Sequence, residues 1–165
     1  MRGALVITLA LLLSACGFRP LYEAGGSSRA MQQHLAGVEV APIADRLGQV
    51  MRNRLLDRLN TGGTADYRLT VTLEQSTQGY GIRPDAAATQ EQLTLVAHVA
   101  FIRLNGEEIV FTEDMRARTS YDLVLSDFAT VTQREDSARR LALELAERIH
   151  RRLALYFTKA ETDVP

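Results

Sequence analysis

Thiols are almost absent from this chain of 165 residues. Cys16 is the only cysteine, so the chain cannot form an internal disulfide. If Cys16 is modified, the folded part has no thiol, which suits an oxidising compartment such as the periplasm. Cysteine-based catalysis in the folded part is then excluded.

Histidine is also scarce, and the usual signatures of catalysis are missing. His34, His98 and His150 are far apart in sequence, and no two have the spacing of metal ligands. The sequence has no glycine-rich phosphate loop after a strand and no nucleophile elbow. We therefore expect no catalytic residue, no bound metal and no cofactor, although a serine or carboxylate site assembled only by the fold stays open.

Neither sign of charge dominates the chain. It has 19 basic and 20 acidic residues, and loss of Arg2 with a signal peptide would leave 18 basic residues. Such a balance gives no strong positive field for nucleic acid. Lys159 is the only lysine, so the basic charge is almost wholly arginine. Arginine suits bidentate contacts with phosphate or carboxylate, but a GC-rich genome would produce the same bias.

The longest apolar run lies at the start of the chain and is short. It extends from Ala4 to Leu13, interrupted only by Thr8, which is too few residues to span a bilayer as a stable helix. A basic Arg2 before the run and small residues after it are typical of a secretory signal. No second apolar stretch is long enough to cross a membrane. We predict a signal peptide over residues 1–15.

The end of this segment, from Leu13 to Cys16, reads Leu-Ser-Ala-Cys and resembles a lipobox, where bacterial lipoproteins are acylated and cleaved. The resemblance implies that Cys16 becomes the first mature residue, with lipid on its sulfur and its amine. An ordinary secretory signal with a chance cysteine is the alternative. Several acyl chains would hold the protein firmly at a membrane, since one chain holds only marginally. Residues 16–35 would then be a lipid anchor and linker.

Periodicity in the rest of the chain predicts a single α+β domain over residues 36–158. Strands are expected near 38–42, 67–75, 92–103 and 107–120, and helices over 45–60 and 133–157. The fold class is a two-layer sandwich, a four-stranded sheet packed on two helices in the order β-α-β-β-β-α. The helices should cover the odd-numbered face of the sheet, with Val71 as the central core residue. Its expected neighbours are Leu69, Leu95, Phe101, Phe111, Leu145 and Ile149.

The connections carry their own signals. Asn105-Gly106 predicts a hairpin, and a three-residue loop over 104–106 with left-handed Gly106 pairs Phe101 with Ile109. We prefer this register because the apolar residues of both strands then share one face. Residues 75–92 are too long for a tight turn. They either extend two strands into a mobile hairpin arm or form a partner-binding loop.

Three further segments can be placed from composition. Residues 23–29 contain Gly-Gly-Ser-Ser and predict a flexible linker. Residues 126–131 are expected to connect the last strand to the last helix. Thr132 to Glu135 have the form of a capping box at the start of that helix. Residues 159–165 are expected to be a disordered tail.

The even-numbered face of the hairpin carries the candidate contact residues. Ile102 and Val110 lie near the turn, where solvent would favour polar groups. Arg116 and Arg118 are two apart on one strand, so they point the same way and could contact an anionic lipid or acidic residues of a partner. The alternative is that exposed arginines keep an edge strand soluble.

The heptad from Cys16 to Tyr22, following a lipobox, resembles the start of the LptE family of lipopolysaccharide-assembly lipoproteins. The order of elements agrees over essentially the whole chain, although in better-known relatives the position of Arg19 tends to be histidine. The resemblance implies a lipid-anchored protein on the periplasmic face of the outer membrane. It implies a plug within the barrel of LptD, with the pair moving lipopolysaccharide to the outer leaflet. No lipopolysaccharide-binding residue of the family has a local motif here.

Two other functions remain open at this stage. One is an auxiliary lipoprotein of an ABC-type lipid transport system, and the other is a structural lipoprotein that ties the envelope to peptidoglycan. Co-purification separates the three, because a barrel, a transporter complex or cell-wall fragments would be recovered. We expect no nucleic-acid partner in any case.

Overall fold

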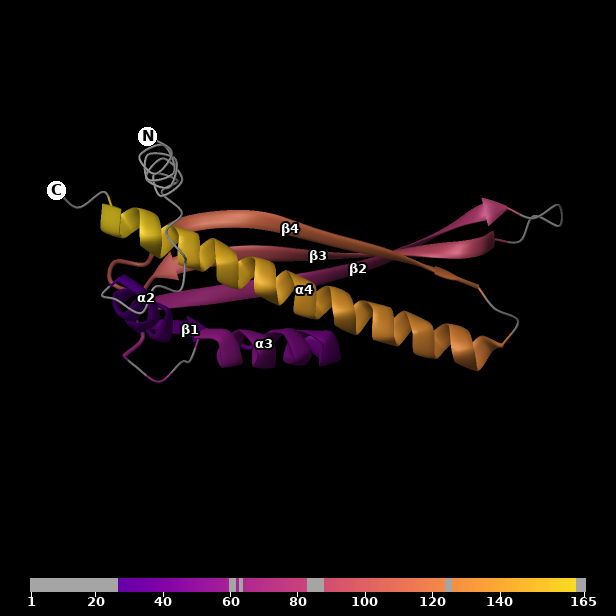
Figure 1. Ribbon diagram of the computed structural model, residues 1–165, viewed down its shortest axis with the longest axis horizontal. Coiled ribbons are helices and arrows are strands. Elements are labelled where there is room, and N and C mark those ends of the chain that lie inside the picture. The colour runs from indigo at the N-terminus through magenta and orange to yellow at the C-terminus, as the bar shows by residue number, and fades with distance from the viewer. Residues whose placement is uncertain (1–26, 60–61, 63, 83–87, 124–125, 163–165) are drawn as a thin grey trace, which may run out of the picture. The chain divides into compact units, whose positions relative to one another are not determined.

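The computed structural model describes residues 27–59, 62, 64–82, 88–123 and 126–162 (Figure 1). The chain divides into two units, residues 1–30 and 31–165, and the second unit holds the sheet. The signal peptide, Cys16 and the heptad after it lie outside the described residues. In chain order the elements are α2 (Ser27–Ala36), β1 (Val38–Val40), α3 (Asp45–Leu59), β2 (Tyr67–Ile82), β3 (Ala88–Arg103), β4 (Glu108–Asp122) and α4 (Asp127–Thr162).

The four strands form one sheet in the order β1-β2-β3-β4. Strand β1 runs parallel to β2 but reaches only residues 67–69 of it, whereas β2, β3 and β4 are antiparallel neighbours along most of their length. The β2–β3 pairing continues from Tyr67 opposite Arg103 to Ile82 opposite Ala88. Residues 75–82 and 88–92 therefore extend the two strands into a hairpin arm, the first of the two alternatives, whereas residues 83–87 lie outside the described residues and the mobility of the arm stays a prediction.

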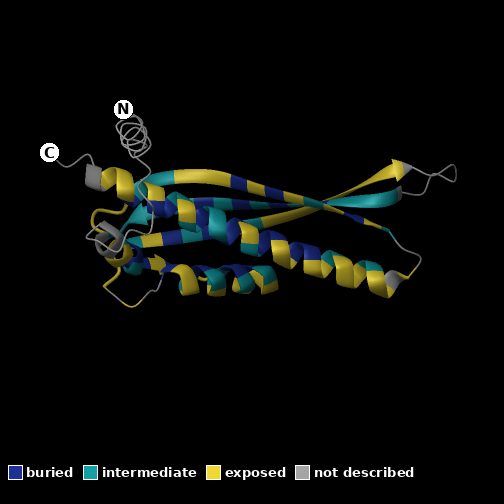
Figure 2. Cartoon of the chain, viewed as in Figure 1, coloured by how far each residue is buried: buried dark blue, intermediate teal, exposed yellow. Residues whose placement is uncertain are grey.

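Helices α3 and α4 cover the odd-numbered face of the sheet, as the alternation of apolar residues predicts (Figure 2). Strand residues such as Leu69, Leu95 and Phe101 are buried on that face, because successive side chains of a strand point to opposite sides. Each helix turns one apolar stripe toward them, since residues three and four apart share a face. The stripes consist of Met51, Leu55 and Leu59 on α3 and Leu141, Leu145, Ile149 and Leu153 on α4. The α+β two-layer fold is confirmed.

The predicted core residues are buried with one exception. Val71 and its expected neighbours lie in the core, but Phe111 is only half-buried. Its ring centroid lies 5.4 Å from that of Phe101, and the guanidinium carbon of Arg152 lies 4.2 Å from its centroid on the α4 side. Phe111 is therefore at the margin of the core, where a cation covers it.

The predicted register of the β3–β4 hairpin was wrong. Phe101 lies opposite Phe111, not Ile109, and the register shifts by one residue between Phe101 and Ile102, where Ile102 lies opposite Ile109. Next to the turn the strands thus follow the register of a tight two-residue hairpin. One extra residue, Val110, is then inserted in β4. Such a bulge returns the apolar residues of both strands to one face. Gly106 is left-handed as expected, with φ of 94°.

Helix α4 starts earlier than expected, and α2 was not predicted. Residues 127–131 are helical rather than a connector, and the N–H of Ala129 donates to Oγ of Ser126 at 3.4 Å, as at a helix N-cap. The predicted capping box lies inside the helix, where Oγ1 of Thr132 donates to the carbonyl oxygen of Phe128 at 3.0 Å. Residues 27–29 of the expected linker belong to α2, and α4 continues to Thr162.

Candidate functional site

The even-numbered face of the sheet is open in the described part of the molecule. Its side chains on β2, β3 and β4 are exposed or half-buried, and both α3 and α4 lie against the opposite face (Figures 1 and 2). This open face carries most of the contact residues expected from the sequence. It also carries a charged cluster that the sequence did not reveal.

The apolar patch near the turn differs from the expected one by one residue. Ile102 is half-buried and lies opposite Ile109, which is 63% exposed. Val110, the bulge residue, is half-buried and packs against the core. The bulge therefore exchanges the two positions, and Ile109 rather than Val110 accompanies Ile102.

Arg116 and Arg118 lie on β4 as expected, opposite Val96 and Thr94 of β3, and both are exposed. Neither guanidinium makes a hydrogen bond or an ion pair with the described residues. The backbone carbonyl of Arg116 accepts a hydrogen bond from Nη1 of Arg148 on α4 at 2.8 Å. Two unpaired guanidinium groups on one face are suited to an anionic ligand.

A histidine and two carboxylates join three strands on this open face. Nδ1 of His98 lies 2.7 Å from Oδ1 of Asp114, and its Nε2 lies 3.5 Å from Oε2 of Glu74. The hydrogen bond with Asp114 raises the pKa of His98, and partial desolvation opposes it. Under the predicted register His98 would have faced Thr112, so the two-residue error concealed this pair.

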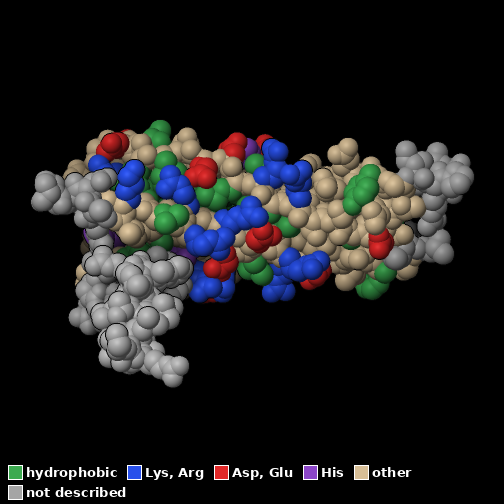
Figure 3. Space-filling view, turned by 45° about the horizontal axis from the view of Figure 1, so that its top comes forward, with side chains coloured by type: hydrophobic (Ala, Val, Ile, Leu, Met, Phe, Trp, Pro, Cys, Tyr) green, Lys and Arg blue, Asp and Glu red, His purple; other side chains and the backbone are tan. Residues whose placement is uncertain are grey.

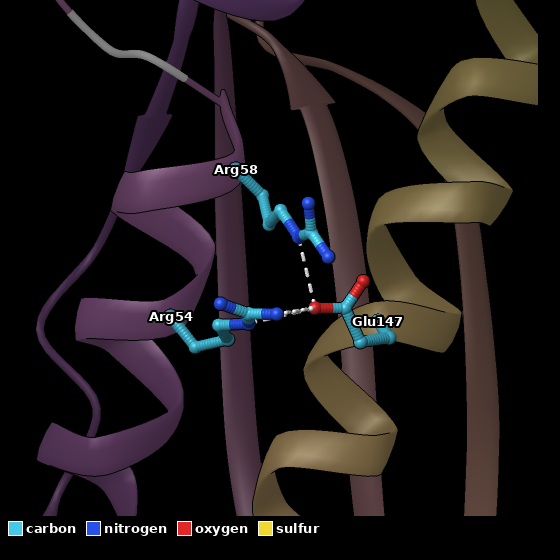
Figure 4. A network of polar contacts seen from close by, with 3 residues as sticks. All are labelled: Arg54, Arg58 and Glu147. Atoms are coloured by element: carbon cyan, nitrogen blue, oxygen red, sulfur yellow. Dashed lines mark hydrogen bonds and ion pairs between the residues drawn. The ribbon is translucent and has the colours of Figure 1, made fainter.

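Two polar clusters hold the helix layer together. Between α3 and α4, Glu147 accepts hydrogen bonds from Nε of Arg54 at 2.6 Å and from Nε of Arg58 at 2.9 Å (Figure 4). Burial opposes ionisation of Glu147, but the hydrogen bonds from Arg58 and Arg54 outweigh it and lower the pKa. Nearer the start of α4, Arg134 donates to Glu91 and to the hydroxyl of Tyr121, each at 2.8 Å. These contacts fix α4 against α3 and against the sheet.

Two of the hollows on the described surface are similar in size. One, of about 440 Å³, lies beside α3 and α4 and includes Arg46, Leu47, Val50 and Ala138. The other, of about 400 Å³, lies between β4 and α4. On the face seen in Figure 3, Lys and Arg side chains gather in the middle, and few lie toward the tips of β2 and β3. Among the described residues no group of His, Cys, Asp and Glu could hold a metal ion.

The described helices also bear on membrane insertion. None of them is both long enough and apolar enough to cross a bilayer.

Comparison with known proteins gives one family and several structural neighbours. The family described as LptE, Lipopolysaccharide-assembly, matches residues 35–153. An uncharacterized protein of Rickettsia prowazekii is 27% identical over 154 residues, which cover 93% of this chain and 96% of that protein. The fold is similar to that of a candidate lipoprotein from Caulobacter crescentus, with a TM-score of 0.62, 20% identity, and coverage of 79% of this chain and 97% of that one.

A second solved structure has the same fold. The rare lipoprotein B from Shewanella oneidensis gives a TM-score of 0.61 at 18% identity, with coverage of 75% of this chain and 98% of that one. At these identities the two structures establish the architecture of the chain. The match over residues 35–153 spans the elements from the end of α2 through most of α4.

Proposed function

Because the chain belongs to the LptE family of lipopolysaccharide-assembly proteins, we propose that it is an outer-membrane lipoprotein that plugs an LptD-type barrel. In this role Cys16 carries the lipid anchor, and the domain faces the periplasm. The domain would hold the barrel in a form that passes lipopolysaccharide to the outer leaflet. This is a role in assembly and not in catalysis.

The observation that carries the proposal is the difference between the two faces of the sheet in a chain that belongs to this family. One face is covered by helices that are braced by Glu147 and Arg134, which makes the body rigid. The other face is open and displays Ile102 beside the exposed Ile109. A rigid body with an open, partly apolar sheet face is suited to burial against the inner wall of a partner.

The arginines of the same face suggest how lipopolysaccharide would be recognised. Arg116 and Arg118 point the same way, and no described acidic residue pairs with either guanidinium. Phosphate groups of lipid A are anionic and would accept charge-assisted hydrogen bonds from them. Replacing both with glutamate should reduce binding of lipopolysaccharide more than binding of an uncharged detergent, and added salt should diminish the difference.

A pull-down from detergent-solubilised outer membrane tests the barrel partner. Wild-type protein should recover an LptD-type barrel, and Ile102→Glu should recover less of it at unchanged thermal melting. Val131→Glu is the matched control, because Val131 is an exposed apolar residue of α4 away from the open face. Equal recovery of the barrel by both variants would show that the open face is not part of the interface with the barrel. Recovery of an inner-membrane ABC transporter instead of a barrel would favour the auxiliary-lipoprotein alternative.

A further inference from the structure

Strand β4 is an edge strand, and half of its backbone hydrogen-bonding groups point away from the sheet. The N–H of Leu123, just after β4, donates to the carbonyl of Thr89 at 2.9 Å, so odd-numbered residues of this strand pair with β3. The pairing is uninterrupted from Asp122 to Phe111. Because backbone groups alternate in direction along a strand, even-numbered residues point to the open edge. These residues are Thr112, Asp114, Arg116, Arg118 and Ser120.

Only one of these outward groups has a partner in the described part of the chain. It is the carbonyl of Arg116, which accepts from Arg148 of α4 at 2.8 Å. The rest form a row over nine residues with no described partner. Natural sheets usually cover, bend or shorten such an edge, because it is a template for another strand. Here the edge is long, and the guanidinium of Arg148 bonds to it only at the carbonyl of Arg116.

A basic groove runs beside this edge. The hollow of about 400 Å³ is bounded by β4 on one side and α4 on the other. Its lining residues are Glu113, Asp114, Met115, Arg116, Arg148, Arg151, Arg152 and Leu155. Four arginines against two carboxylates leave a positive excess. Two of these arginines are already paired, since Nε of Arg152 donates to Oε2 of Glu113 at 2.8 Å and the guanidinium of Arg148 pairs with Glu144. The positive excess therefore rests on Arg116 and Arg151. The Arg151 side chain is exposed and has no bonding partner among the described residues.

We propose that the groove between β4 and α4 is a strand-acceptor site that binds an extended acidic segment of a partner protein. The segment adds as a fifth strand to the edge of β4, and its backbone bonds to residues 112–120. A strand that enters between an edge strand and a helix gains affinity from main-chain hydrogen bonds and specificity from alternate side chains. Acidic side chains would meet the groove arginines on one side, and Leu155 offers an apolar contact.

The acceptor site goes beyond the proposed function and does not depend on it, because any partner with such a segment satisfies it. The probe is a capped decapeptide of alternating glutamate and valine, added to the full-length protein in detergent. Its lysine–valine counterpart should bind about tenfold more weakly, because charge complementarity selects partners. A fully N-methylated glutamate–valine peptide keeps the charge but cannot donate backbone hydrogen bonds, so it too should bind about tenfold more weakly.

The decisive measurement is amide hydrogen exchange along β4, residue by residue. Binding of the glutamate–valine peptide should slow exchange of the even-numbered amides from Thr112 to Ser120. The odd-numbered amides already bond to β3 and should not change. Arg151→Glu should weaken peptide binding roughly fivefold. Lys159→Glu, the same charge reversal on α4 outside the groove, should leave it unchanged.

Three results would overturn the acceptor site. Equal binding of the methylated and unmethylated peptides would show a purely ionic surface. Protection of all amides alike, or of another strand, would place the peptide elsewhere. Protection of even-numbered amides in the free protein that rises with protein concentration would show that a second copy of this chain occupies the edge. Loss of barrel recovery with normal peptide binding would count against the proposed function alone, so the two failures are distinguishable.

Discussion

Leu145 offers the sharpest test of the two-layer fold. It lies on the apolar stripe of α4, is 0% exposed, and belongs to the same buried cluster as Leu95 and Phe101 of β3. Truncating it to alanine removes buried apolar atoms and leaves a cavity. The helix cannot collapse freely into that cavity, because Glu147 ties it to α3 and Arg134 ties it to the sheet. We therefore expect a loss of roughly 2–5 kcal/mol in the free energy of unfolding.

The matched control is Leu155→Ala on the same helix. Leu155 is 60% exposed, so the same chemical change should cost less than about 0.5 kcal/mol. Both variants would be measured by denaturant unfolding with linear extrapolation, and Leu145→Ala should also lower the melting temperature by roughly 10 °C. Equal losses in the two variants, or a loss below about 0.5 kcal/mol for Leu145→Ala, would mean that this face of α4 is not buried.

Three further predictions address the anchor and the two titratable clusters. Cys16→Ala should block acylation and lipoprotein-type cleavage, and mass spectrometry of the mature N-terminus would refute the anchor by finding Cys16 unmodified in the wild type. Burial opposes ionisation of Glu147, but hydrogen bonds from two α3 arginines lower its pKa. A lowered folded-state pKa contributes stability above the unfolded-state pKa and loses it as the pH falls. Glu147→Gln should therefore destabilise the protein at pH 7, and the difference from wild type should shrink below about pH 4; a constant difference would contradict the ion pair. The hydrogen bond that the His98 ring donates to Asp114 raises the pKa of His98, so the stability that this bond contributes is present below the unfolded-state pKa and is lost as the pH rises through the folded-state pKa. Asp114→Asn should lower the His98 titration midpoint seen by NMR, and an unchanged midpoint would exclude the pair.

Periodicity predicted the architecture because the burial of one face of each strand and helix leaves the strongest pattern in this sequence. Strict alternation from Tyr67 onward and the helical spacing of α4 each specify which residues must leave water. Element ends follow from weaker, local energies. Helix α4 begins near Ser126, earlier than the capping box at Thr132 predicts. Its first turns were not recognised in the sequence, because the exposed Phe128 and Val131 interrupt the apolar period. Helix α2 escaped prediction because the Gly-Gly-Ser-Ser sequence that runs into its first turn is typical of a linker.

The open face was harder to predict, since its geometry depends on pairing between strands. The requirement that apolar residues share a face allows registers that differ by two residues, because the side-chain period of a strand is two. Hydrophobicity therefore placed His98 and Asp114 on the same face but could not place them opposite each other. The turn chemistry of Asn105-Gly106 favours the tight register, which conflicts with the shared apolar face. The protein resolves the conflict with a bulge at Val110.

That bulge has consequences for every candidate contact on the open face. It moves Val110 into the margin of the core and leaves Ile109 outside, and it brings Asp114 opposite His98. It also decides which backbone groups of β4 reach the open edge, because inserting one residue reverses the direction of every later group relative to the turn. Without the insertion, odd-numbered residues would face the groove, and Arg148 would meet a different carbonyl. The apolar patch, the charged cluster and the edge of β4 therefore share a single determinant, the extra residue beside the turn.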